Sequence, residues 1–190
     1  MKRLPASLLP ASACSFTRLA LSFVLPVLML AGCGSVFGPS APPPACPEAR
    51  VVANLERMTQ YRPGEGRDLT DVLFEARIGD LTGECGYDES ALEVAITVPI
   101  QIARGPANQE RVTRLEYFVA IQDPQGTVIA KRSFPVEVAF ERNQSRALFT
   151  DELEQRIPLA ELNQGPAYRV LLGFQLSEEQ VQDNIRRARR

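Results

Sequence analysis

Apolar and polar residues alternate along most of the chain after residue 46, a pattern typical of half-buried β-strands. The longest alternating run covers residues 92–102. Six apolar residues share one face of this run: Leu92, Val94, Ile96, Val98, Ile100 and Ile102. Pro99 falls on the opposite face. Because proline has no N–H for a sheet ladder, it predicts an edge strand or a bulge here.

Two further runs, residues 115–121 and 128–140, are separated by Asp123-Pro124-Gln125-Gly126. Asp, Pro and Gly at the first, second and fourth positions favour a type I turn. The two runs therefore predict a β-hairpin. Pro135 lies on the outer face of its second strand and again predicts a sheet edge.

Other strands are expected at residues 51–55, 72–78 and 168–176, and less clearly at 147–157, where apolar positions mix both faces. About seven short strands in about 130 residues predict an all-β domain over residues 46–176, folded as a two-sheet antiparallel sandwich. Residues 177–190 predict a short C-terminal helix with a basic tail. Ser177 and Gln180 suit a capping box, and Val181, Ile185 and Ala188 form a stripe for docking.

The N-terminal segment has the features of an export signal. Lys2, Arg3 and Arg18 precede an apolar run at residues 19–30 that is too short to cross a bilayer, which needs about 20 residues. The run ends in Leu30-Ala31-Gly32-Cys33, which resembles the lipobox of bacterial lipoproteins. That resemblance implies a signal peptide at residues 1–32 and a diacylglycerol and a fatty acyl group such as palmitate on Cys33. An ordinary signal peptide is the alternative.

Residues 33–45 form a proline-rich segment, expected to be a lipidated tether and not a folded part of the domain. Gly34 and Ser35 follow Cys33, without the Asp that retains enteric lipoproteins in the inner membrane. The resemblance therefore implies the outer membrane, with the domain at its periplasmic face. The membrane is the first expected partner, bound through the lipid anchor.

Cys46 and Cys85 are the two cysteines that remain in the expected domain. An even pair in the oxidising periplasm usually forms a disulfide, and no Cys-x-x-Cys redox motif is present. We therefore expect a Cys46–Cys85 bridge that fixes the start of the domain to an interior loop.

The alternating pattern also resembles immunoglobulin-like sandwiches of cell-envelope proteins. Three segments resemble lipoproteins of unknown activity from Gram-negative bacteria: Cys46-Pro47, residues 118–123 and Gly173-Phe174-Gln175-Leu176. This resemblance implies a fold and a location, and it implies no activity.

Composition narrows the chemistry. The chain has no histidine, which removes the commonest general base and a frequent zinc ligand. It also has no tryptophan. Without residues 1–32, 18 basic and 23 acidic residues remain, a net charge of −5 that argues against nucleic-acid binding. The loop acids Asp68, Asp71, Asp80, Glu84, Asp88 and Glu89 lack a calcium-loop spacing, so no metal and no cofactor is expected.

Weaker motifs have simpler explanations. Residues 63–68, Pro-Gly-Glu-Gly-Arg-Asp, are expected to be a loop and not a phosphate nest. The arginines at the C-terminus suit the negative end of a helix, with contact to an anionic surface as the alternative. The sequence therefore predicts a non-enzymatic structural or protein-interaction module of the envelope with an envelope protein as partner. The alternative is a module that binds a small molecule or a glycan.

Overall fold

The computed structural model describes residues 42–64 and 66–189. The expected signal peptide, the lipidation site Cys33 and the tether up to residue 41 lie outside the described residues. Within the described part of the chain, no helix is long and apolar enough to span a membrane.

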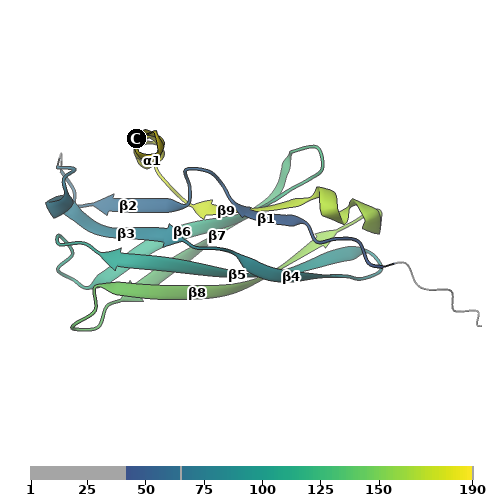
Figure 1. Cartoon of the computed structure of the whole chain (residues 1–190), viewed down its shortest axis with the longest axis horizontal. Helices are drawn as coiled ribbons and strands as arrows, with labels where there is room; N and C mark the ends of the chain where they lie inside the picture. Colours follow the sequence, from purple (N-terminus) through teal and green to yellow (C-terminus); the bar gives the residue numbers. More distant parts are fainter. Residues whose placement is uncertain (1–41, 65, 190) are drawn as a thin grey trace, which may run out of the picture. The chain divides into compact units, whose positions relative to one another are not determined.

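Two β-sheets pack face to face, which confirms the predicted all-β two-sheet sandwich (Figure 1). The first sheet has the strand order β1 (Glu48–Val51), β9 (Arg169–Phe174), β6 (Val112–Gln122) and β7 (Val128–Ala139). The second sheet contains β2 (Arg57–Tyr61), β3 (Val72–Ile78), β4 (Thr82–Tyr87), β5 (Ala91–Arg104) and β8 (Arg146–Pro158). All pairings are antiparallel except β1 with β9, which is parallel.

Strand β5 organises the second sheet. It pairs along its whole length with β8 on one side, while β3 and β4 follow each other along its other side. Its six predicted inward residues, from Leu92 to Ile102, are all at most 5% exposed, as the alternation predicted. They pack against the inward residues of the first sheet, including Tyr117, Val170, Leu172 and Phe174.

The prediction that Pro99 marks an edge strand is wrong, because β5 is a central strand. The backbone of Pro99 faces the β3–β4 side, where its carbonyl accepts the Gly79 N–H (2.8 Å). At this point β3 has ended and β4 has not begun, so the missing proline N–H interrupts little of the ladder. Pro135 does lie on an edge strand, β7, as predicted.

The strand count was also too low, and one strand was misplaced. The expected strand at residues 51–55 ends at Val51, because the chain turns at Asn54, whose φ is 65°. Strands β2 and β4 were missed. Gly83 and Gly86 weaken the strand pattern of β4, yet Gly83 is required there because a Cβ would lie 2.2 Å from the Ala95 carbonyl oxygen.

Short helical segments complete the domain: the 3-10 turns η1 (Leu69–Asp71) and η2 (Leu162–Ala167), and helix α1 (Glu178–Ala188). The capping box of Ser177 and Gln180 is present as predicted. The predicted docking stripe of Val181, Ile185 and Ala188 is only partly correct. Ala188 is exposed, and the most buried residue of the helix is Asn184. The Asn184 amide donates to the carbonyl oxygens of Asn54 (2.9 Å) and Arg57 (2.8 Å).

Replacing Asn184 by Ala is expected to loosen α1 without unfolding the sandwich. The change removes both hydrogen bonds to the chain around β2, each worth about 1 kcal/mol. Amide hydrogen exchange of the α1 residues should accelerate about tenfold, while β5 and β6 keep their protection. Gln182→Ala, an exposed position on the same helix, is the control. Equal exchange in the two variants would contradict this docking role.

Candidate functional site

The predicted site cysteines lie close together. Cys46 and Cys85 form a disulfide with their Cα atoms 5.7 Å apart. The bridge joins the segment before β1 to β4, so it connects the start of the domain to the second sheet. The Tyr87 hydroxyl reinforces this connection by donating to the Ala45 carbonyl (2.6 Å). Burial raises the pKa of Tyr87, so this hydroxyl stays protonated and remains a donor.

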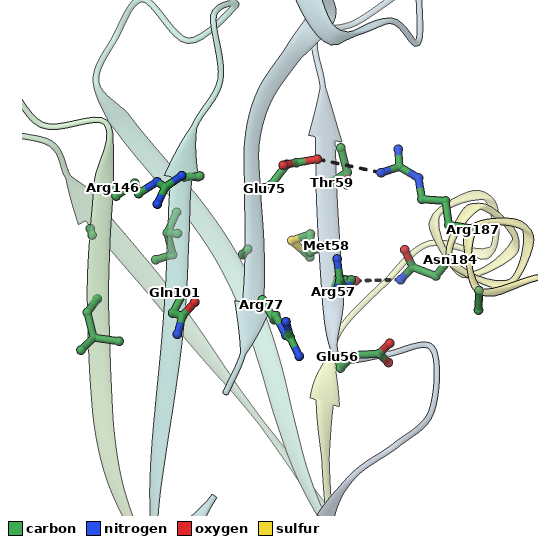
Figure 2. A pocket seen from close by; sticks show the side chains of 16 residues that line it. Glu56, Arg57, Met58, Thr59, Glu75, Arg77, Gln101, Arg146, Asn184 and Arg187 are labelled. Carbon is green, nitrogen blue, oxygen red and sulfur yellow. Dashed lines mark hydrogen bonds and ion pairs between the residues drawn. The ribbon is translucent and has the colours of Figure 1, made fainter. Parts of the chain in front are cut away.

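A groove of about 830 Å³ crosses the outer face of the second sheet, between α1 and β8 (Figure 2). We call it the arginine groove, because Arg57, Arg77, Arg146 and Arg187 all line it. Its floor consists of outward-facing residues of β2, β3, β5 and β8. Its volume lies in the range of small-molecule sites.

Strand register places the floor residues in two rows that cross the sheet. The first row is Arg57, Arg77, Gln101 and Leu148, and the second is Thr59, Glu75, Ala103 and Arg146. These side chains face outward because their neighbours Met58, Ala76 and Ile102 are buried in the core. Leu148 is 65% exposed and places an apolar end on the groove.

The charges of the arginine groove are mostly positive. Four arginines face two glutamates, Glu56 and Glu75, which leaves a net charge of +2 in a chain whose net charge is −2. Arg187 lies 3.9 Å from Glu75 and donates to the Tyr61 hydroxyl (2.7 Å). Among the described residues, Arg57, Arg77 and Arg146 have no carboxylate within ion-pair distance.

The other end of the same face has the opposite charge. A smaller depression of about 560 Å³ is lined by Glu84, Glu93 and Glu154 together with Arg156. Arg156 pairs with Glu93 (2.5 Å) and with Asp88 (2.6 Å). The Ser90 backbone N–H and then Arg156 hold the pKa of Asp88 below its ordinary value. The arginine of this depression is therefore engaged, in contrast to three of those in the arginine groove.

The outer edges of β7 and β8 are both open in the described domain, since each strand has a single neighbour. The Arg104 backbone N–H donates to the Ser145 carbonyl, so the backbone groups of the even-numbered β5 residues point toward β8. Their partners on β8 are odd-numbered, so the backbone groups of the even-numbered β8 residues point to the open edge. On β7 the edge is partly blocked. The Glu116 backbone carbonyl accepts the Gln175 N–H on the β9 side, so the backbone of Glu116 points away from β7. Pro135, which lies opposite Glu116 on β7, therefore points its backbone nitrogen toward the open edge, where it has no N–H to offer.

One ionisable pair lies between the sheets. The Tyr117 hydroxyl, on β6, donates to Asp151 Oδ2 on β8 (2.6 Å), and the Tyr117 ring stacks on Phe134. Burial and then Asp151 raise the pKa of Tyr117 well above its ordinary value. This pair connects the two sheets and faces neither depression.

The other motifs named from the sequence are engaged locally. Arg67, of the loop at residues 63–68, donates to the carbonyls of Gly64 and Gly66 and pairs with Glu179. Asp71 is buried and pairs with Arg62 (2.5 Å). Across residues 42–64 and 66–189, no cluster of three Cys, Asp or Glu side chains is placed to hold a metal ion. Sequence reasoning missed the arginine groove, because its arginines come from four separate elements.

No protein-family model matches the chain, and no match was found among curated proteins or solved structures. The fold and surface described above define the class of protein as an all-β sandwich with a charged groove and open strand edges.

Proposed function

We propose that the chain is a lipid-anchored protein of the bacterial envelope whose sandwich domain acts as a non-enzymatic structural or interaction module. The Cys46–Cys85 disulfide is the observation that supports this location, because structural disulfides persist in oxidising compartments. It agrees with the export signal and with the lipobox-like Leu30-Ala31-Gly32-Cys33. Together they support a domain in the periplasm that is anchored to the outer membrane through Cys33.

The open edge of β8 supports the interaction role. This strand has 13 residues, and its even-numbered backbone groups face outward. An exposed edge of this length offers a ladder of donors and acceptors for an added strand. We propose that an envelope protein binds there by strand addition.

Photo-crosslinking tests this interaction. A photoreactive residue at Thr150, at the middle of the β8 edge, is expected to capture one dominant envelope protein in intact cells. The same residue at Glu116, exposed on the central strand β6, is the matched control and should capture little. Equal capture at both positions, or none at Thr150, would contradict the strand-addition proposal.

A second candidate function is the binding of a small molecule or glycan. The arginine groove favours it, since a depression of about 830 Å³ with three arginines that have no ion pair among the described residues is suited to an anionic ligand. This function does not require the open edge of β8, and both can coexist in one anchored domain.

A further inference from the structure

The first-row arginines of the groove are in an unfavourable arrangement. Arg57 and Arg77 lie directly opposite each other on β2 and β3. Directly opposed residues on antiparallel strands have Cβ atoms about 5 Å apart, and like charges there are destabilising. Neither guanidinium has a carboxylate partner among the described residues, whereas Arg62, Arg114 and Arg156 elsewhere in the domain do. In the described domain, the pair therefore has no carboxylate at ion-pair distance.

We propose that the arginine groove binds a phosphomonoester of a polyhydroxylated molecule, such as a sugar phosphate. The phosphate would lie at Arg57 and Arg77. A phosphomonoester carries a charge of about −1.5 to −2 at pH 7, which matches two guanidinium groups, whereas one carboxylate neutralises only one. Guanidinium forks also donate two parallel hydrogen bonds to phosphate oxygens.

The rest of the floor suits the hydroxyl-bearing part of such a ligand. Gln101 is next to Arg77 in the first row. Thr59, in the second row, lies diagonally across from Arg77. Both side chains line the groove and offer an amide and a hydroxyl to a sugar. Arg146, on β8, is two strands from β3, about 10 Å away, and provides a second positive contact for a longer ligand. In Figure 2, Arg146 and Gln101 lie on the neighbouring strands beyond Arg77.

The two glutamates of the groove, Glu56 and Glu75, reduce its positive charge. Glu75 is compensated by Arg187, at 3.9 Å. Glu56 lines the groove beside Arg57, and its Oε2 atom is buried without a hydrogen-bond partner in the described domain. Because this carboxylate opposes an anion, Glu56→Gln is expected to strengthen phosphate binding about threefold.

Calorimetric titration of the purified full-length protein in detergent, at low salt, tests the proposal with four probes. Glucose 6-phosphate should bind more tightly than inorganic phosphate, and glucose should not bind measurably. Dihexanoyl phosphatidic acid supplies the same phosphomonoester on a lipid headgroup and should bind no better than inorganic phosphate. Tighter binding of the lipid would overturn the assignment to a polyhydroxylated ligand, and no binding of any phosphate would overturn the site.

Variants test the residues. Arg57→Gln and Arg77→Gln should each weaken glucose 6-phosphate binding about tenfold, and Arg77→Lys should recover only part of the loss, because it keeps the charge without the fork. Arg132→Gln, an exposed arginine on β7 with no ion pair among the described residues, is the control. Equal weakening by Arg132→Gln would show non-specific attraction and overturn the proposal.

A stability measurement separates a binding role from a structural one. Without ligand, Arg77→Gln should raise Tm by about 1–2 °C, since it removes the opposed charge. A fall in Tm would contradict the like-charge argument. This inference rests on the ligand-binding candidate function alone. The groove variants should leave membrane attachment and Thr150 crosslinking unchanged, so failure here and failure of the anchored interaction module are distinguishable.

Discussion

Replacing Cys46 and Cys85 by Ser is expected to lower the free energy of unfolding by about 4 kcal/mol. The bridge closes a loop across a separation of 39 residues, and the chain-entropy estimate for such a loop gives about that value. For a domain of this size, the loss corresponds to a fall in Tm of about 10 °C. Thermal denaturation of the full chain, followed by circular dichroism, measures it.

Wild-type protein treated with a reductant is the control and should match the double variant. A Tm within about 2 °C of the oxidised protein would contradict the structural role of the bridge. The expected loss also bears on function. Strand β1 pairs with β9 alone, over four residues, and the proposed tether enters the domain immediately before it. Without the bridge, tension from the proposed membrane anchor would act directly on this four-residue pairing of β1 with β9.

Tyr117→Phe is expected to cost about 2 kcal/mol, the second largest effect. The substitution keeps the stacked ring and the core volume but leaves the inward-facing Asp151 carboxylate without its donor. Urea denaturation measures the loss. Tyr168→Phe is the matched control, because the hydroxyl of this half-buried tyrosine has no partner among the described residues, and it should change stability by less than about 0.5 kcal/mol. Equal losses in the two variants would contradict the cross-sheet role.

The same pair predicts a pH dependence. The folded-state pKa of Tyr117 is raised above its ordinary value of 10.0, so only the unfolded chain releases this proton near pH 10. The stabilisation is complete below that pH and is lost as pH rises, by up to about 1.4 kcal/mol per pH unit. The stability difference between wild type and Tyr117→Phe should therefore shrink above pH 10. A difference that stays constant from pH 8 to 11 would contradict this.

Sequence periodicity predicted the core strands well, because β5 and β6 each have a continuous buried apolar face, although β6 is buried on both faces from Tyr117 to Ile121. It failed where an inward position is polar. Asp151 faces inward on β8 and breaks the alternation there, and only the hydroxyl of Tyr117, 34 residues away, explains it. It also failed for β2, in which Met58 is the only fully buried residue. Such strands are specified by their neighbours, which local patterns do not reveal.

The disulfide was predictable from the sequence and the arginine groove was not. Two cysteines in a domain that is expected to be exported leave one possible pairing. By contrast, the opposition of Arg57 and Arg77 depends on the register between β2 and β3. A shift of one residue would direct one of these side chains toward the other face of the sheet. The edge assignment of Pro99 failed for a related reason. On the side of β5 that faces away from β8, Pro99 lies opposite the junction between β3 and β4.

The most direct test of the central claim is mass spectrometry of the N-terminal peptide of the full chain, produced in a Gram-negative host and isolated from its membranes. We expect a mature chain that begins at Cys33 and carries a diacylglycerol and an acyl group, and a Cys33→Ser variant that leaves the membrane fraction. An unmodified N-terminus at another residue, or a Cys33→Ser variant that still sediments with membranes, would contradict it.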